Sequence, residues 1–387
     1  MNKYIKNIVV LILAILIVSC VKKQLNMTYI NEEHIVVDIY SLEPTSENKI
    51  NLSSIADSIN YIPLETDDNI LVGSVNKIEI VDSLFYILDK KTDKIWCFNS
   101  LGEFIFELFR KGQGPEEYTK IQDFCIDQTN NNIVIWDRNI GKILYYDLSG
   151  KYEKNEYINI KPLEFCLLEG SKLFFTGGRD IFMGKDKNQY GYNCFVYDNN
   201  KQITFRYFPY IEFLDDLSKD KTIDSYESNA IVQYGVNDTI YKINKYGLIT
   251  NKILFDFGKN RLPLKSVISN NLSEFLNSQS YSYITEALGS EHFLYATYNY
   301  KGRIRFIIKN NKTNKIINGS IIENDIDLIH YLNPTPIKLL NNKVYFVKEA
   351  SEICTQEKDN KKIHRDIKSL SLLNEFDNPV IVIINLR

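Results

Sequence analysis

The feature that most constrains the fold of this chain is a pattern that occurs twice within residues 84–150. Each copy is a short apolar run ending in aspartate, a polar turn, a second apolar run, and a turn that closes on glycine. Asp89 and Asp137 are 48 residues apart, and so are Gly102 and Gly150. A repeat of this length built from short strands is typical of the blades of a β-propeller.

Similar apolar runs continue along the rest of the chain. We assign them to six blades at residues 77–109, 121–160, 164–208, 230–257, 283–321 and 337–386. The last blade has only three strands of its own, and an open ring would leave unpaired sheet edges at both ends. The strand-like segment from Ile59 to Leu64 can supply the missing strand. The sequence therefore predicts an all-β fold, a six-bladed β-propeller of four-stranded antiparallel blades, closed by an N-terminal strand that completes the last blade.

The N-terminus has the features of a secretion signal. Lys3 and Lys6 precede an unbroken apolar run over residues 8–18, which has the length of a signal peptide and is short for a membrane span. The run ends in Ile-Val-Ser-Cys at residues 17–20, which resembles the lipobox of bacterial lipoproteins. That resemblance implies cleavage before Cys20 and a lipid on its thiol. The alternative is an ordinary signal peptide with a chance cysteine.

This interpretation divides the chain into a signal peptide at residues 1–19, a lipidated cysteine with a tether at residues 20–50, and the propeller at residues 51–387. Acyl chains contribute on the order of 0.8 kcal/mol per buried methylene group, so several chains would anchor the protein in a membrane. Val21 follows the cysteine, whereas aspartate there would resemble an inner-membrane retention signal. We expect a cell-envelope lipoprotein, at the outer membrane and facing the periplasm.

The composition limits which partners the chain is expected to bind and which roles its cysteines are expected to have. The formal net charge of −3 shows no basic excess of the kind that binds nucleic acid. Apart from the N-terminal one, the cysteines are Cys97, Cys125, Cys166, Cys194 and Cys354, and no two have CxxC spacing. We interpret them as buried free thiols, although an oxidising compartment also permits a disulfide.

Several segments resemble the six-bladed β-propeller lipoproteins, which are related to NHL-repeat and TolB-like propellers. They are Tyr61 to Thr66, the two repeat copies, Gly112 to Tyr118, Phe255 to Gly258 and Asn378 to Val382, in the order expected of that family. The resemblance covers residues 53–387, with one departure at Glu116, where the family's loop usually has a second glycine. It implies the propeller fold and little chemistry, because the family's members are largely without an assigned function.

Motifs for catalysis or metal binding are scarce. The four histidines lack the spacing of a zinc helix, and the chain has neither a GxSxG elbow nor a P-loop. Asp89 and Asp137 are predicted to accept backbone N–H bonds in the turns that follow them. Their repetition argues against two carboxylates with distinct acid–base roles. We therefore predict no catalytic residue, no metal site and no cofactor.

The loop between the first two blades carries the densest set of polar side chains. Arg110 and Lys111 stand beside a glycine-rich turn, and Gln113, Glu117 and Tyr118 follow. Because the loop joins the outer strand of one blade to the inner strand of the next, it should cross one face toward the channel. We predict that these five residues form a polar partner site on that face. The alternative is a connection whose glycines only satisfy backbone geometry.

Two further segments are candidates for partner contacts. Arg179 lies in a second glycine-containing loop. Leu272, Phe275 and Leu276 have helical spacing, which predicts a short helix at the rim within residues 264–280.

Two functions of different classes remain. The first is a non-enzymatic, lipid-anchored binding or scaffold protein whose face loops bind a peptide, glycan or protein. The second is a hydrolase or lyase, because some propellers of this shape resemble lactonases and vinyl-type lyases that hold a central calcium ion. The predicted innermost strands offer Glu79, Asp123 and Glu286, with no matching set in every blade. We favour binding over catalysis.

Overall fold

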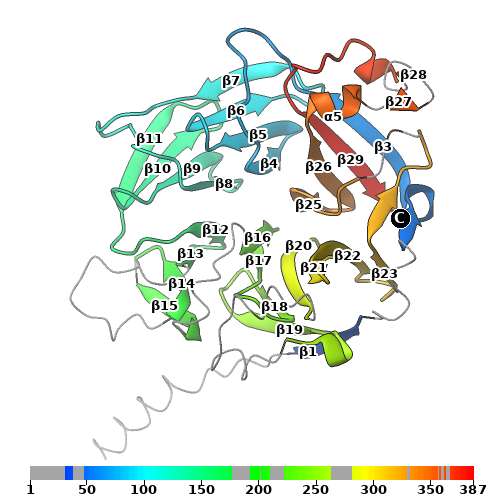
Figure 1. Cartoon of the computed structure of the whole chain (residues 1–387). Coiled ribbons are helices and arrows are strands. Elements are labelled where there is room, and N and C mark those ends of the chain that lie inside the picture. The colour runs from blue at the N-terminus through cyan, green and yellow to red at the C-terminus, as the bar shows by residue number, and fades with distance from the viewer. Residues whose placement is uncertain are drawn as a thin grey trace, which may run out of the picture.

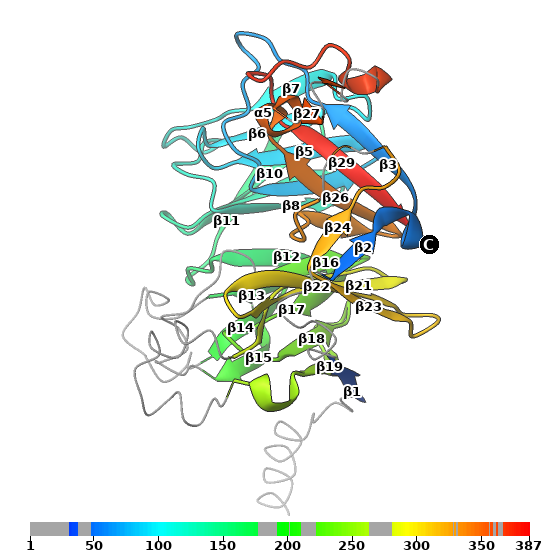
Figure 2. The same cartoon turned by 45° about the vertical axis from the view of Figure 1, so that its right-hand side comes forward.

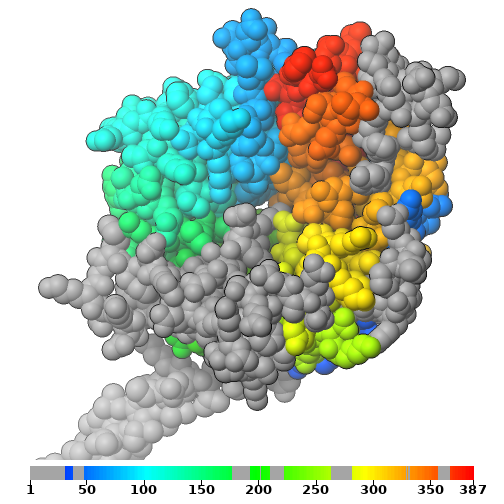
Figure 3. Space-filling model, in the orientation of Figure 1, coloured from blue at the N-terminus to red at the C-terminus, as the bar shows by residue number. Residues whose placement is uncertain are grey.

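The protein is a ring of β-sheets, each with one edge at the centre (Figure 1). The computed structural model describes residues 31–37, 48–176, 192–200, 202–209, 222–262, 281–327, 329, 332–355, 357–358, 361–362 and 367–387. Six antiparallel blades of four strands make up the ring, and Figure 3 shows those of residues 77–157 and 283–386 packed side by side. The prediction of a six-bladed β-propeller is confirmed.

In the first three blades, the four strands follow one another from the centre outward. Blade 1 consists of β4 (Lys77–Val81), β5 (Leu84–Asp89), β6 (Lys94–Phe98) and β7 (Phe104–Leu108). Blade 2 consists of β8 (Asp123–Asp127), β9 (Asn132–Asp137), β10 (Lys142–Asp147) and β11 (Tyr152–Tyr157). Blade 3 consists of β12 (Glu164–Leu168), β13 (Ser171–Phe175), β14 (Tyr192–Asp198) and β15 (Ile203–Pro209).

The remaining blades complete the ring. Blade 4 consists of β16 (Ile223–Tyr226), β17 (Asn229–Val232), β18 (Thr239–Ile243) and β19 (Ile249–Asp256). Blade 5 consists of β20 (Tyr283–Gly289), β21 (Phe293–Tyr300), β22 (Arg303–Asn310) and β23 (Ile316–Gly319). Blade 6 consists of β25 (Lys338–Leu340), β26 (Lys343–Lys348), β29 (Val380–Leu386) and β3 (Ala56–Pro63).

Short elements decorate blade 6 and the connections. They are the helix α5 (Ala350–Cys354), the strands β27 (Glu357–Lys358) and β28 (Lys361–Lys362), and the 3-10 turns η2 (Leu52–Ser54), η3 (Gly258–Asn260) and η5 (Lys368–Leu370). Among the described residues, no helix is long and apolar enough to cross a bilayer.

The two ends of the propeller sequence close the ring within one blade. Strand β3 pairs antiparallel with β29, so that Ile59 lies opposite Ile384 and Pro63 opposite Val380. The predicted closure by an N-terminal strand is confirmed. It leaves Pro63 at the end of an outermost strand, where the missing N–H costs no ladder hydrogen bond.

Two further N-terminal strands pack against the outside of the ring (Figure 2). Strand β1 (Asn31–Val36) pairs in parallel with β19, which makes blade 4 five-stranded, and β2 (Lys49–Asn51) pairs in parallel with β24 (Ile321–Glu323). Ile35 is buried against blade 4, and Glu33 forms an ion pair of 2.5 Å with Lys309 of blade 5. Part of the segment that we predicted to be a tether is therefore docked on the propeller.

The innermost strand of blade 4 was missed by the sequence analysis, which began that blade at Ala230. The structure adds β16 before it, so Ala230 belongs to the second strand. The sequence of β16, Ile-Asp-Ser-Tyr, has polar residues at its two central positions and lacks the apolar run that marks the other strands. As an innermost strand it faces the central channel, where polar side chains are tolerated.

The hydrophobic core lies between neighbouring blades. Leu88 and Ile95 of blade 1, for example, pack in one buried cluster with Ile133 and Leu144 of blade 2. Cys97, Cys125, Cys166 and Cys194 are buried free thiols, as interpreted from the sequence. Cys354 differs from that interpretation because it is only half-buried, and its thiol donates to the carbonyl of Leu373 at 3.6 Å.

The repeated aspartates organise the turns as predicted. Asp89 Oδ1 accepts the backbone N–H of Lys91 at 3.0 Å, and Asp137 Oδ1 accepts that of Asn139, also at 3.0 Å. Asp89 also accepts the N–H of Gly73, in the connection that leads into the same blade. Each aspartate thus has a structural role, which explains why it recurs with the blade period.

Candidate functional site

The loop that sequence analysis favoured is held by contacts within itself and with blade 2. Lys111 Nζ lies 2.6 Å from Asp93 Oδ2, and the Glu117 carboxylate accepts the N–H of Gly114 at 2.7 Å. From below, Lys142 Nζ donates to the carbonyl oxygens of Gly114 and Glu117, at 2.9 Å each. Lys111 therefore already has a partner in the β5–β6 turn of blade 1, and Glu117 has one within the loop.

Tyr118 lies beneath this loop. Its side chain is fully buried, and its hydroxyl donates to the carbonyl of Asp93 at 2.9 Å and accepts the N–H of Arg110 at 3.2 Å. The residue supports the loop from the core and does not reach a partner. Arg110, Lys111 and Gln113 are the exposed members of the predicted set, and their role in binding stays a prediction. Cys20, Arg179 and residues 264–280 lie outside the described residues.

A network of ion pairs crosses the central channel. Lys77 Nζ of β4 lies 2.9 Å from Asp123 Oδ1 of β8, and Lys338 Nζ of β25 lies 3.2 Å from Glu79 Oε2 of β4. Burial opposes the charge on both lysines, but the neighbouring carboxylates raise the pKa of each above its usual value. Glu79 and Asp123, which the sequence analysis singled out, thus have lysine partners from neighbouring strands.

Two more carboxylates tie blade to blade around the channel. Asp224 of β16 accepts the N–H of Gly289 in blade 5 at 3.0 Å. The carboxylate of Glu164 in blade 3 accepts the N–H groups of Thr222 and Ile223, at 2.8 and 3.0 Å, at the start of blade 4. Burial, with the nearby charge of Asp123, raises the pKa of Glu164 to about 7.

These charged residues share a position that the sequence analysis overlooked. Lys77, Asp123, Glu164 and Lys338 are each the first residue of an innermost strand, and Asp224 is the second residue of another. An ionisable residue at the start of the innermost strand in five of six blades was therefore a detectable signal. It was hidden because the charges differ in sign from blade to blade.

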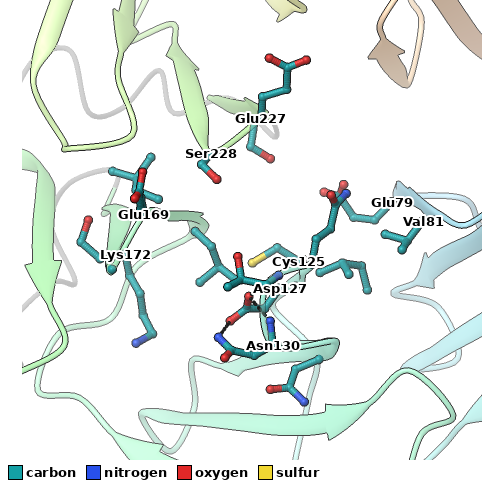
Figure 4. Close-up of a pocket in the computed structure, with 18 of the residues that line it drawn as sticks. Glu79, Val81, Cys125, Asp127, Asn130, Glu169, Lys172, Glu227 and Ser228 are labelled. Carbon is teal, nitrogen blue, oxygen red and sulfur yellow. Dashed lines mark hydrogen bonds between the residues drawn. The ribbon is translucent and has the colours of Figure 1, made fainter.

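A cavity of about 750 Å³ opens at the other end of the innermost strands (Figure 4). Most of its lining comes from the last residues of these strands and the turns that lead to the second strands, in blades 1, 2, 3 and 4. Tyr145, Lys154 and Glu156 of the outer strands of blade 2 and Lys338 and Leu340 of β25 in blade 6 complete it. The Arg110–Tyr118 loop, in contrast, leads into the first residue of β8. Because innermost strands of a propeller run in the same direction along its axis, the cavity and this loop lie on opposite faces.

The floor of the cavity is formed by the channel residues that lie nearest to it. Glu79, Lys338 and Cys125 line it there, and the ion pair between Glu79 and Lys338 closes the channel beneath. In Figure 4 the Glu79 side chain points from its strand toward the middle of the cavity.

One wall is a cluster of charged groups around an aromatic ring. Lys154 Nζ lies 4.8 Å from the centre of the Tyr145 ring and Lys172 Nζ 6.0 Å from it, both within cation–π range. Glu156 Oε1 accepts the Tyr145 hydroxyl at 2.5 Å and pairs with Lys172 Nζ at 3.0 Å. The wall therefore presents ammonium groups whose charges are partly balanced.

The rim is made of tight turns with strained backbones. Glu227 and Ser228 form the β16–β17 turn and have φ angles of 46° and 60°, in the left-handed region that favours glycine. Asp127 accepts the Asn130 side-chain amide at 2.8 Å in the β8–β9 turn, as the dashed line in Figure 4 shows. Both turns place polar side chains around the opening.

The channel carboxylates do not fit a central calcium site. Ammonium groups of Lys77 and Lys338 lie against Asp123 and Glu79, in the positions that a cation would need. Among the described residues, no group of three or more His, Cys, Asp or Glu side chains is arranged to hold a metal ion. The arrangement is suited to binding a polar ligand through hydrogen bonds and charge.

Comparison with known proteins gives a family and a fold. The family described as "Domain of unknown function (DUF4934)" matches residues 34–385. A crystal structure of a Bacteroides fragilis NCTC 9343 protein that is named as an exported protein is 17% identical, covers 92% of this chain and 99% of its own, and has a TM-score of 0.68.

A second solved structure, a member of the DUF4221 family from Bacteroides vulgatus ATCC 8482, is 8% identical. The match covers 88% of this chain and 99% of that one, with a TM-score of 0.50. At these identities the likenesses show the propeller fold alone. No protein with a curated function matches the chain.

Proposed function

The chain belongs to the DUF4934 family, a domain of unknown function, and from that premise we propose that it is a non-enzymatic, lipid-anchored binding propeller of the cell envelope. The ligand site is the cavity on the face of the hairpin turns. The main observation in support of this proposal is that five blades contribute polar side chains to one cavity of about 750 Å³. Ligand sites in proteins typically have volumes of about 300–1,000 Å³.

Binding is favoured over catalysis because the ionisable groups at the floor of the cavity are held in an ion pair or kept in the neutral form. A general acid or base has to exchange a proton with its substrate, and a nucleophile has to be exposed to it. Lys338 and Glu79 are instead held in a pair, and burial with neighbouring charges raises the pKa of the Cys125 thiol well above its usual value. The thiol therefore stays protonated and unreactive at neutral pH.

The docked N-terminal strand supports the envelope part of the proposal. Only residues 21–30 separate Cys20 from the first residue of β1. Extended chain spans at most about 3.6 Å per residue, so a lipid on Cys20 would keep the outer edge of blade 4 within about 40 Å of the membrane. A tether of this length holds the cavity near the membrane while leaving it open to soluble ligands.

The experiment compares two matched tryptophan substitutions on opposite faces. Thr129→Trp places an indole at the exposed rim of the cavity, and Gln113→Trp does the same on the exposed loop between blades 1 and 2. Short peptides and oligosaccharides are screened by the rise in melting temperature that ligand binding causes. A ligand that stabilises the wild type and Gln113→Trp but not Thr129→Trp supports the cavity. The reverse pattern assigns the site to the loop and refutes the proposal.

A further inference from the structure

The floor of the cavity contains a carboxylate oxygen that lacks a hydrogen-bond donor. Glu79 is only 9% exposed, and Lys338 Nζ contacts its Oε2 at 3.2 Å. Its Oε1 accepts no hydrogen bond from any described residue, and the Lys77 ammonium lies 3.7 Å away, beyond hydrogen-bond distance. Leaving a buried acceptor unsatisfied is unfavourable, so a ligand that brings a donor to this point would be stabilised there.

The cavity as a whole carries more carboxylates than ammonium groups. The cavity is lined by five carboxylates, Glu79, Asp127, Glu156, Glu169 and Glu227, and by three lysines, Lys154, Lys172 and Lys338. In the channel beneath, Asp123 pairs with Lys77, Asp224 lies 3.7 Å from the Lys338 ammonium, and Glu164 accepts backbone N–H groups of blade 4. An enclosed site with low-dielectric walls concentrates such a field and attracts cations.

From these two observations we propose that the cavity binds a cationic group, the ammonium or guanidinium of a lysine- or arginine-containing peptide, with a donor of that group bonded to Glu79 Oε1. This inference rests on the proposed function, because it names the ligand class of the same cavity. A neutral glycan could donate a hydroxyl to Glu79 but would gain nothing from the excess of carboxylates. An ammonium or guanidinium group supplies the hydrogen-bond donor that Glu79 lacks and is also attracted by the excess of carboxylates. Charge-assisted hydrogen bonds are about twice as strong as neutral ones.

The test is calorimetric titration of the purified protein with three probes, tri-lysine, tri-glutamate and maltotriose. We expect tri-lysine to bind, its affinity to fall as salt is added, and tri-glutamate and maltotriose not to bind. Glu79→Gln keeps the size of the floor side chain and removes its charge, and it should weaken tri-lysine binding at least tenfold. Glu169→Gln is the matched control, because that rim carboxylate already pairs with Lys245 at 2.6 Å, and it should change the affinity by less than threefold.

A second variant covers the case in which Glu79→Gln fails to fold. Glu227→Lys reverses a charge on an exposed rim turn, where it cannot disturb the channel, and it should also weaken tri-lysine binding at least tenfold. Absence of tri-lysine binding at millimolar concentration refutes the cationic ligand. Binding of maltotriose alone, blocked by Thr129→Trp, also refutes it but leaves the proposed binding function intact. Tri-lysine binding that neither Thr129→Trp nor Glu79→Gln affects refutes both proposals for the cavity.

Discussion

The closure of the ring depends on one buried asparagine, which leads to a quantitative prediction. The Asn378 side chain donates to the carbonyl oxygens of Glu65 and Ile70, at 2.7 Å each, and accepts the N–H of Val72 at 2.8 Å. It is 4% exposed and lies two residues before the final strand of the chain, β29. The side chain thus ties the C-terminal strand to the segment that leads from β3 into blade 1.

We predict that Asn378→Ala lowers the free energy of unfolding by about 3 kcal/mol. Three part-buried hydrogen bonds of about 1 kcal/mol each are lost, and alanine offers their three backbone partners no replacement. With an unfolding entropy of about 0.7 kcal/mol/K for a chain of this size, the melting temperature should fall by about 4 °C.

Equilibrium unfolding in urea, followed by the fluorescence of the buried Trp96 and Trp136, measures this change. The matched control is Asn385→Ala in β29, because the Asn385 side chain donates a hydrogen bond to Ser58 Oγ at 2.6 Å, and its loss should cost about 1 kcal/mol. If the two variants lose the same stability, Asn378 does not fasten the ring and the reasoning is wrong.

Three further predictions concern the channel, the rim and the anchor. The pKa of Glu164 rises from 4.5 to about 7 in the folded protein, so the folded state holds this proton more tightly than the unfolded chain and loses stability as the pH rises from 4.5 to 7. In urea titrations over this range, the wild type should lose up to about 3 kcal/mol relative to Glu164→Gln. Parallel pH profiles of the two proteins would contradict this prediction. Ser228→Gly relieves a backbone at φ 60°, and Ser83→Gly relieves one at φ 65°, so each should add about 0.5–1 kcal/mol of stability in the same assay. Only Ser228→Gly should alter ligand binding. An equal effect of both variants on binding would refute the assignment of Ser228 to the rim. Cys20→Ser should abolish lipidation and move the protein out of the detergent phase in a partitioning assay, whereas unchanged partitioning would refute the lipobox interpretation.

Several features of the fold were readable from the sequence because they are local and periodic. Strand pairs separated by short turns recur with a spacing of 48 residues, and the aspartate that ends a second strand bonds to N–H groups only two residues away. The need to avoid open sheet edges then predicted that Ile59 and its neighbours pair with the C-terminal strand. Each inference required only the pattern of nearby residues and one rule about sheets.

The candidate site was decided by the tertiary structure. Lys77 meets Asp123 across 46 residues of sequence, and Glu79 meets Lys338 across 259, because ring closure brings the first residues of distant strands to one axis. Packing of blade 1 against blade 2 buries Tyr118 beneath its loop, and the common direction of the innermost strands places the cavity on the opposite face. Charge pairs across a propeller axis have no fixed sequence spacing and no required order of sign, so the linear pattern that identifies the blades does not identify the partners at their centre.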